Sequence, residues 1–373
     1  MKYLARVASA LVLGVSAVNA GEVSLPQKET LLGLPPVPVP KDNPLTLEKA
    51  KLGKQLFEDK RFSADGAISC AHCHKPELAF SDGLPVSEGI GGQKGTRNAP
   101  TVINAAYYKT QFWDGRRPSL EAQSKDPFIN PIEHGLKSHD PIVQIVRTDP
   151  DYRKQFRQAF GLEQDRITMD HVAQAIASFE RTLVAGNSPF DRYQYGGDKT
   201  ALSASAIRGL AVFRDKGRCV SCHVIEGSTA LFTDNQFHNL GVGFDKIESR
   251  LPEIIAAYRQ AKQAGKEIDE TVLTQVEMSE LGRFIVTGDT QDIGRFKTST
   301  LRNIALTAPY MHDGSLKTLE EVVDFYDKGG RDNPMLDGGI RPLNLTAQEK
   351  SDLVAFMKSL TSNRFANLQS NKR

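Results

Sequence analysis

The sequence predicts an all-α protein with two domains. Two segments carry apolar residues at helical spacing: one begins at Thr168 and ends before Gly186, and the other begins at Thr346 and runs to Leu360. Thr346 and Glu349 have the spacing of a capping box, in which each side chain bonds the backbone N–H of the other residue. Few segments show the alternating pattern of a strand. Helices therefore dominate the prediction.

An internal repeat supports the division into two domains. Residues 53–60 read GKQLFEDK and residues 209–216 read GLAVFRDK, so that Gly, Phe, Asp and Lys recur at matching places. Each copy precedes a Cys-x-x-Cys-His motif, at 70–74 and at 219–223. We therefore expect two related units, each with a helix, a loop and the motif.

The two Cys-x-x-Cys-His motifs contain all four cysteines of the chain. In such a motif the two thiols can form thioethers with one haem, and the following histidine can ligate its iron. A redox dithiol, half of a zinc site and disulfides are the alternatives, but two isolated pairs do not obviously supply four tetrahedral zinc ligands. We predict two covalent haem c groups, attached by Cys70, Cys73, Cys219 and Cys222 and ligated by His74 and His223.

The N-terminus has the pattern of an exported protein. Lys2 and Arg6 accompany a short apolar run over 8–18, and Val18-Asn19-Ala20 resembles a cleavage site. We predict a signal peptide over residues 1–20 and a periplasmic mature protein, with a retained N-terminal anchor as the alternative. The rest of the sequence lacks the run of about 18 apolar residues that spans a membrane, so no membrane insertion is expected. A net charge of +2 argues against nucleic acid as a partner.

The remaining organisation follows from composition. Residues 21–44 are rich in proline and predict an extended arm. A plausible junction near residue 190 divides the chain into an N-terminal haem c domain (45–190) and a C-terminal haem c domain (191–373). The charged stretch 252–280 predicts a solvated, helical elaboration. The predicted fold is thus all-α, with two cytochrome c-like haem domains.

Four further motifs carry a family resemblance. They are QKGTRNAPT at 93–101, FWDGR at 112–116, LRN at 301–303 and APYMHDGS at 308–315. Together with the cysteine motifs they resemble the bacterial di-haem cytochrome c peroxidases and the MauG proteins of the same superfamily, over about residues 45–360. The resemblance implies that the first haem receives peroxide and that the second stores or passes electrons.

The resemblance also implies catalytic residues. Glu133 matches the acid-base glutamate of the family, and Gln123 and Pro127 match its other distal-pocket positions. A carboxylate can take a proton from the near oxygen of H2O2 and return one to the leaving oxygen, although Glu133 alone would more often be a solvated loop residue. Trp113, the single tryptophan, matches a relay between the two haems; alone it would more often be core packing.

Two departures from the conventional pattern favour the MauG-like branch. Conventional members place a histidine that caps the first haem where this chain has Ile90, which cannot ligate iron. We therefore expect the first haem to be five-coordinate or water-bound in the resting ferric state. Conventional peroxidases place a methionine at the second haem, where this chain has Tyr326. A phenolate is a hard, anionic ligand that favours ferric iron. Met311 and Met335 are rival ligands.

The resemblance finally implies a calcium ion between the domains, with Asn98, Thr307 and Pro309 as protein ligands, since oxygen donors suit Ca²⁺. The leading prediction is a periplasmic di-haem peroxidase that reduces H2O2 with electrons from a small cytochrome c or a cupredoxin. One alternative is a MauG-like oxidase that modifies residues of a partner protein. The other is a non-catalytic di-haem electron carrier, which would have two six-coordinate irons.

Overall fold

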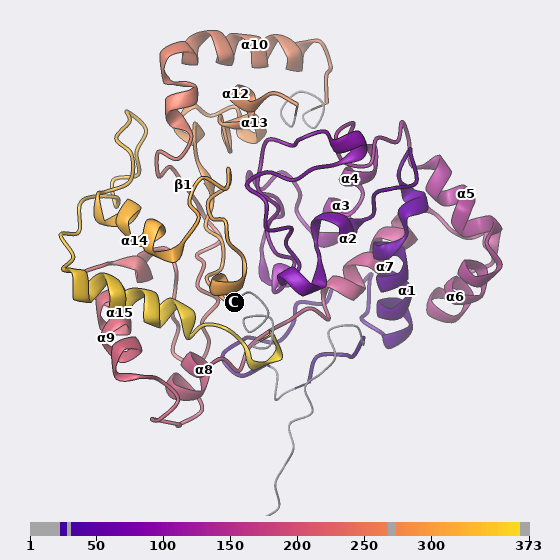
Figure 1. Cartoon of the computed structure of the whole chain (residues 1–373). Helices are drawn as coiled ribbons and strands as arrows, with labels where there is room; N and C mark the ends of the chain where they lie inside the picture. Colours follow the sequence, from indigo (N-terminus) through magenta and orange to yellow (C-terminus); the bar gives the residue numbers. More distant parts are fainter. Residues whose placement is uncertain (1–22, 28–30, 268–273, 366–373) are drawn as a thin grey trace, which may run out of the picture.

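The chain is mostly helical, as predicted (Figure 1). The computed structural model describes residues 23–27, 31–267 and 274–365, so the predicted signal peptide lies outside the described residues. The described elements are α1 (Leu47–Glu58), α2 (Cys70–Cys73), α3 (Leu120–Gln123), α4 (Asp126–Ile129), α5 (Asp140–Thr148), α6 (Pro150–Phe160), α7 (Met169–Glu180), α8 (Pro189–Gln194), α9 (Ala204–Arg214), α10 (Leu251–Gln263), α12 (Val276–Ser279), α13 (Phe284–Thr287), α14 (Leu319–Asp327), α15 (Ala347–Lys358) and the antiparallel strands β1 (Phe237–His238) and β2 (Phe296–Lys297).

The N-terminal half is organised by the packing of α1 along α7. Gly53 of α1 lies at the contact, where an added Cβ would overlap the carbonyl oxygen of Ala175, so the close approach requires glycine. Phe179 of α7 packs beside it and joins a large apolar core. Thr168 caps α7 in a capping box with His171. The glycine of the first repeat thus sets the distance between two helices.

The C-terminal half repeats this arrangement with α9 and α15. An added Cβ at Gly209 of α9 would overlap the carbonyl oxygen of Asp352, and Phe356 of α15 packs beside it. The capping box predicted for Thr346 and Glu349 is present at the start of α15. The repeat found in the sequence is therefore also a repeat of helix packing.

Helix α7 is shorter than the sequence indicates, because it ends at Glu180 rather than close to Gly186. The backbone groups that would continue the helix are bonded elsewhere. The carbonyl oxygen of Leu183 accepts from the N–H of Asn104 at 2.8 Å, and the N–H of Ala185 donates to Asn104 Oδ1 at 2.8 Å. Apolar spacing alone does not reveal this competition.

The proline-rich arm lies against both halves. Arg302 donates to the carbonyl oxygen of Gly33 at 2.7 Å, and Tyr107 donates to that of Pro35 at 3.1 Å. Arg302 also forms a buried, two-pronged ion pair with Asp191, at 2.8 and 2.9 Å. One guanidinium therefore links the arm to the junction between the halves.

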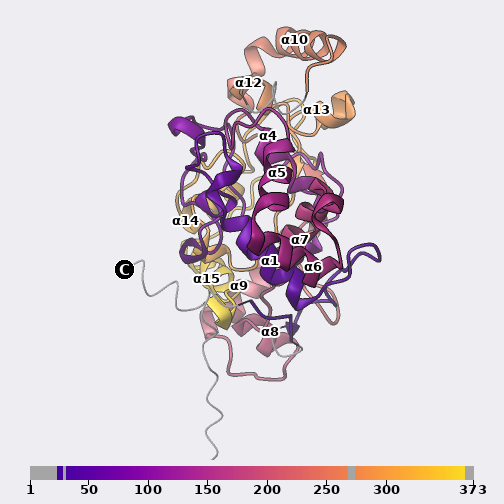
Figure 2. The ribbon, with the colours of Figure 1, turned by 90° about the vertical axis from the view of Figure 1, so that its right-hand side faces the viewer.

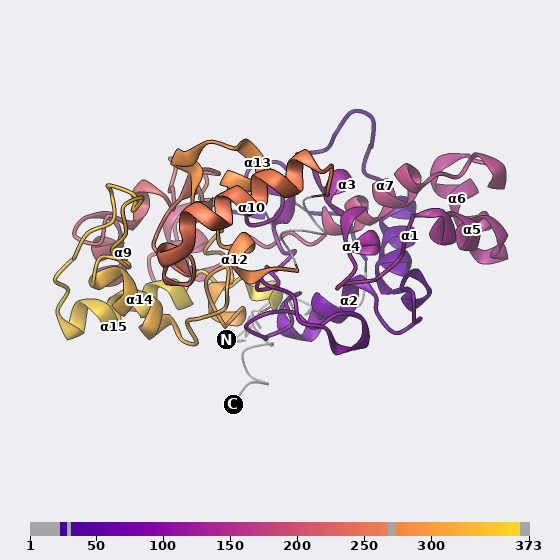
Figure 3. The same ribbon diagram turned by 90° about the horizontal axis from the view of Figure 1, so that it is seen from above.

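The two halves lie side by side, with α1, α5, α6 and α7 at one end and α9, α14 and α15 at the other (Figures 1 and 3). Helices α10, α12 and α13 form a separate layer over the junction, at the opposite end of the molecule from α8 (Figure 2). This layer has its own apolar cluster, which includes Ile254, Tyr258 and Phe284. In the described part of the chain, every helix is too short or too polar to cross a membrane.

Candidate functional site

Each Cys-x-x-Cys-His motif borders an internal cavity. The first cavity has a volume of about 160 Å³ and is lined by Cys73 and His74, while Cys70 packs against the neighbouring apolar core. The second has a volume of about 250 Å³ and is lined by Cys219, Cys222, His223 and Tyr326. Its lining is largely apolar, as a porphyrin requires.

The two motif histidines are held in the same way. His74 Nδ1 lies 3.2 Å from the carbonyl oxygen of Phe80, and His223 Nδ1 lies 2.9 Å from that of Phe232. Both phenylalanines have left-handed backbone angles, with φ of 56° and 53°. A donor proton on Nδ1 leaves the Nε2 lone pair for a metal. Burial lowers the pKa of both histidines, which favours this neutral form.

The three residues predicted for the peroxide site lie together on the first cavity. Gln123 from α3, Pro127 from α4 and Glu133 from the following loop all line it. Glu133 Oε1 accepts a hydrogen bond from Asn130 Nδ2 at 2.8 Å, which orients the carboxylate. Separate elements thus deliver one amide and one carboxylate to the same space.

Ile90, at the position where conventional members of the family have a capping histidine, is not among the lining residues of the first cavity. Its side chain packs against the backbone of Gly135, and its N–H donates to the carbonyl oxygens of Ile132 and Glu133 at 2.9 and 3.0 Å. The loop is therefore fixed by backbone bonds, and it brings no imidazole to the cavity.

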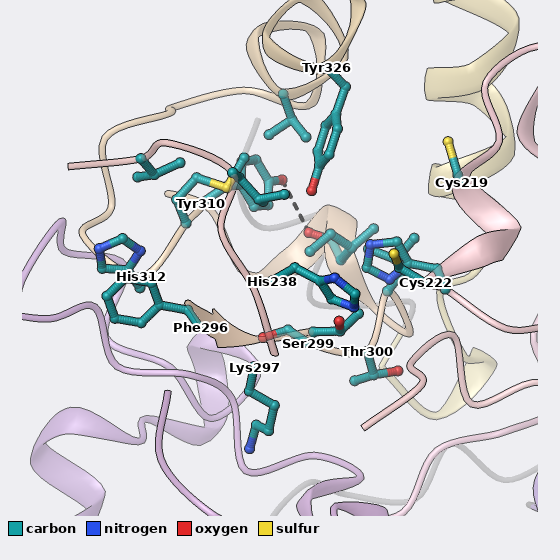
Figure 4. Close-up of a pocket in the computed structure, with 18 of the residues that line it drawn as sticks. Cys219, Cys222, His238, Phe296, Lys297, Ser299, Thr300, Tyr310, His312 and Tyr326 are labelled. Carbon is teal, nitrogen blue, oxygen red and sulfur yellow. Dashed lines mark hydrogen bonds between the residues drawn. The ribbon is translucent and has the colours of Figure 1, made fainter. Parts of the chain in front are cut away.

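Tyr326 of α14 points its hydroxyl into the second cavity (Figure 4). Within the described residues this hydroxyl has no hydrogen-bond partner, and burial raises the pKa of the phenol. Of the two rival ligands, Met311 also lines the cavity, whereas Met335 packs against the cluster under α10 and does not.

The two cavities are lined by residues at matching positions after matching helix caps. Ser119 caps α3 and Thr318 caps α14, each through a side chain that accepts from the backbone N–H three residues later. Eight residues after each cap stand Pro127 and Tyr326, and both line their cavities. Proline has no side-chain donor atom, so the two halves differ at the matching place.

Trp113 and Lys297 line both cavities and form part of the wall between them. The Trp113 indole N–H donates to the carbonyl oxygen of Asn98 at 2.9 Å. The Lys297 ammonium donates to the carbonyl oxygen of Thr110 at 2.9 Å and lies 3.8 Å from the centre of the Tyr108 ring. Burial lowers the pKa of Lys297 to about 7. The sequence analysis did not identify this lysine.

A second group missed by sequence reasoning is Glu280, which is 2% exposed. Its Oε2 lies 2.7 Å from His312 Nε2. The His312 ring stacks on Phe296 with centroids 3.5 Å apart, and its edge faces Trp113 at 6.4 Å. Glu280 belongs to the stretch expected to be a solvated elaboration. That stretch therefore also delivers a buried carboxylate to the junction.

His238 on β1 faces the second cavity close to Cys222 (Figure 4). Its ring nitrogens lie 2.9 Å from Asp234 Oδ2 and 2.7 Å from Asp337 Oδ2. Asp234, followed by Cys222, raises the pKa of His238, which favours the protonated imidazole beside the cavity. The cysteine sulfur, Asp234 and His238 form a cluster with metal-ligand spacing among the described residues, but a thioether sulfur is a weak ligand.

The residues proposed for calcium, Asn98, Thr307 and Pro309, also line the second cavity. The Asn98 amide group donates to the carbonyl oxygen of Leu84 at 2.8 Å, and its backbone N–H donates to that of His312 at 2.8 Å. Within the described residues, these bonds leave its Oδ1 without a donor. Asn98 lines both cavities and so lies at the junction where the ion is expected.

Comparison with known proteins shows the family to which the chain is similar. The sequence profile of the di-haem cytochrome c peroxidase family matches residues 47–200. Cytochrome-c peroxidase IdrP1 of Denitromonas iodatirespirans is 40% identical over 95% of this chain and 91% of its own length. Methylamine utilization protein MauG of Methylorubrum extorquens is 40% identical over 87% of this chain and 81% of its own length.

Solved structures are also similar to this chain. A MauG-like protein associated with microbial copper homeostasis superimposes with a TM-score of 0.73 at 35% identity, over 90% of this chain and 97% of that one. The di-haem peroxidase BthA of Burkholderia thailandensis shares the fold, with a TM-score of 0.66 at 23% identity over 87% of this chain and 88% of its own. The chain therefore belongs to the di-haem cytochrome c peroxidase and MauG family, which is a family of oxidoreductases.

Proposed function

We propose that this protein is a periplasmic di-haem peroxidase of the MauG-like branch, which reduces H2O2 in the first cavity. The observation that supports this most directly is the composition of that cavity. It combines His74 with Gln123 and Glu133, and Pro127, which has no donor atom, lines it at the place that matches Tyr326 of the second cavity. Ile90 lies outside the lining, in a loop that brings no imidazole to the cavity. A cavity with one candidate iron ligand and a nearby acid-base group suits the binding and reduction of peroxide.

The residues fit two haem c groups. Each cavity borders a cysteine pair and a histidine whose Nδ1 is bonded to a backbone carbonyl oxygen, and its walls are mostly apolar. Basic side chains that could pair with the haem carboxylates border the cavities: Lys297 between the two and His238 beside the second. Cys70, Cys73, Cys219 and Cys222 would attach the haems, and His74, His223 and Tyr326 would ligate them.

When bound, haem supplies the iron that accepts peroxide and electrons. The task of the chain is to position the peroxide and move its protons. Glu133 would take a proton from one peroxide oxygen at its carboxylate and would return it to the leaving oxygen. Asn130 holds that carboxylate in place, and Trp113, in contact with both cavities, serves as the relay.

The electrons come from outside the chain in this proposal. A small cytochrome c or a cupredoxin is the proposed donor, in the periplasm where the predicted signal peptide would deliver the protein. A calcium ion held by Asn98, Thr307 and Pro309 would connect the halves. The side-chain Oδ1 of Asn98, which has no donor among the described residues, supports this assignment. Removal of calcium with a chelator should lower the thermal unfolding temperature reversibly.

The test is low-temperature EPR of the diferric protein, repeated after one equivalent of H2O2 without added reductant. We expect one high-spin and one low-spin haem, and prompt loss of both signals with peroxide. Two low-spin signals that persist until one electron is added would contradict the open first site. A protein that then fails to react even when reduced would be an electron carrier.

A second candidate is an oxidase that modifies a partner protein. This candidate function is suggested by the sequence identity of the chain to a MauG protein, which is 40% and equals its identity to a cytochrome-c peroxidase. Trp113 is the single tryptophan of the chain and is hydrogen-bonded inside the junction. Transfer of an oxidising equivalent to a partner protein at the surface would therefore need tyrosines. Competition between a reduced cytochrome and a candidate precursor protein, after peroxide addition, separates the two functions.

A further inference from the structure

One buried acid in the first cavity has no role in the site described so far. Glu180, the last residue of α7, is 3% exposed and lines the cavity together with His74, Gln123 and Glu133. It lies on the apolar side of the helix, four residues after Ile176. Carboxylates are rarely buried so completely without a partner.

Glu180 lacks such a partner in the described part of the chain. Its Oε2 is buried and makes no hydrogen bond there. The adjacent guanidinium of Arg181 is bonded to the Glu121 carboxylate at 2.6 and 3.1 Å and to the carbonyl oxygen of Pro38 at 3.1 Å. The cation next to Glu180 in the chain is therefore committed to another carboxylate.

Burial raises the pKa of Glu180, Arg181 opposes this and Glu121 adds to it, and together they bring the pKa to about 8. At neutral pH the side chain is mainly a neutral carboxylic acid, with one O–H to donate. The other titratable or charged groups that border Glu180 or the cavity are Cys70, Cys73, His74, Arg97, Tyr108, Arg116, Glu121, Glu133, Arg181 and Lys297.

The C-terminal half provides an internal comparison. Gly53 meets Ala175 and Phe179 as Gly209 meets Asp352 and Phe356. The next residue along α7 is the acid, and the next residue along α15 is a methionine that lines the second cavity. The helix crossing therefore accepts an apolar side chain at this place, and only the first cavity has an acid there.

We propose that Glu180 is a second proton-holding residue of the peroxide cavity, which donates a hydrogen bond into the cavity and supplies a proton during turnover. This inference rests on the proposed function. Reduction of one H2O2 to two water molecules consumes two electrons and two protons. The redox partner supplies the two electrons. Glu180 Oε–H supplies one of the two protons, and the second proton comes from solvent through water. Solvent also returns a proton to the Glu180 carboxylate.

Infrared difference spectroscopy of the haem-loaded ferric protein tests the proton directly. A protonated carboxyl has a C=O stretch separate from carboxylate bands. We expect this band in the wild type, a shift in D2O, and a second shift when cyanide binds in the first cavity. The band should be absent from Glu180→Gln and from Glu180→Met. The methionine variant copies Met357 of the other half and keeps the test usable if Glu180→Gln misfolds. A band that ignores cyanide, or that survives both substitutions, overturns the proposal.

Steady-state kinetics distinguishes failure of this inference from failure of the proposed function. We expect Glu180→Gln to reduce peroxide at least tenfold more slowly than the wild type, with unchanged resting EPR signals. If both proteins turn over equally fast, the proton supply is overturned while the peroxidase stands. If the wild type does not consume peroxide, the proposed function fails, and the proton-supply part of this inference fails with it.

Discussion

Pro127 and Tyr326 hold matching places in the two halves, and their side chains differ in what they can offer a metal. A proline ring has no donor atom, whereas a phenol that releases its proton to solvent on binding a ferric ion would become a strong anionic ligand. The pKa of Tyr326 is raised by burial, and the charge of a bound metal ion would favour the phenolate in that cavity.

Replacement of Tyr326 by phenylalanine removes the proposed oxygen ligand and keeps the ring. We expect the low-spin ferric signal of the second haem to become high-spin, and its reduction potential to rise, because the anionic donor is lost. EPR and a spectroelectrochemical titration measure the two effects. Met311→Leu, in the same cavity, should leave both unchanged. If Met311→Leu changed the spin state and the potential while Tyr326→Phe left both unchanged, Met311 would be the ligand.

Glu133→Gln keeps the shape of the proposed acid-base group and removes its proton chemistry. Peroxide turnover should fall by about 10² to 10⁴-fold, the usual contribution of a positioned acid-base group, while the resting EPR spectrum stays the same. Stopped-flow measurement of peroxide consumption provides the test. Glu77→Gln, an exposed carboxylate close to the first motif, is the matched control. Equal losses in the two variants would exclude a specific role for Glu133.

At the scale of the elements, each half depends on one glycine where two helices cross. Gly53 and Gly209 allow α1 to approach α7 and α9 to approach α15. Both crossings lie beside the motif-bearing loops, so helix spacing also fixes where the histidines stand. The same feature explains why glycine recurs at the start of both sequence repeats.

Gly53→Ala should therefore destabilise the N-terminal half. The added methyl group would overlap a backbone carbonyl, which side-chain rotation cannot relieve, and overpacking of this kind costs about 1 to 3 kcal/mol. Urea unfolding followed at the haem absorbance gives the free energy of unfolding. Gly227→Ala is the control, since nothing lies within 4 Å of its added Cβ. Identical midpoints for both variants would show that α1 and α7 can move apart at little cost.

Across the whole molecule, a buried ion cluster joins parts that are distant in sequence. Asp114 is fully buried and bonds Arg97 at 2.6 Å and Arg116 at 3.1 Å. Arg97 also donates to Ser279 of α12 at 2.8 Å. The cluster therefore ties the layer of α10, α12 and α13 to the wall between the cavities.

This cluster predicts a dependence of stability on pH. Burial raises the pKa of Asp114, but Arg116 and Arg97 lower it more, to about 2. A depressed carboxyl pKa stabilises the fold fully above the unfolded value near 4, and the effect is lost as pH falls through about 2. The advantage of the wild type over Asp114→Asn should shrink by roughly 2 kcal/mol between pH 5 and pH 2. Urea unfolding across that range tests this, and parallel curves would contradict it.

The sequence by itself determined the helical class, the repeat, the two covalent motifs and the family, because helix caps, apolar spacing and short motifs are local features. It also placed Gln123, Pro127 and Glu133 on one cavity, through the resemblance. Tertiary structure decided where α7 ends, since Asn104 competes for its backbone groups. It alone revealed Glu180, Glu280 and Lys297 as buried charged residues, because burial depends on packing partners that lie far away along the chain.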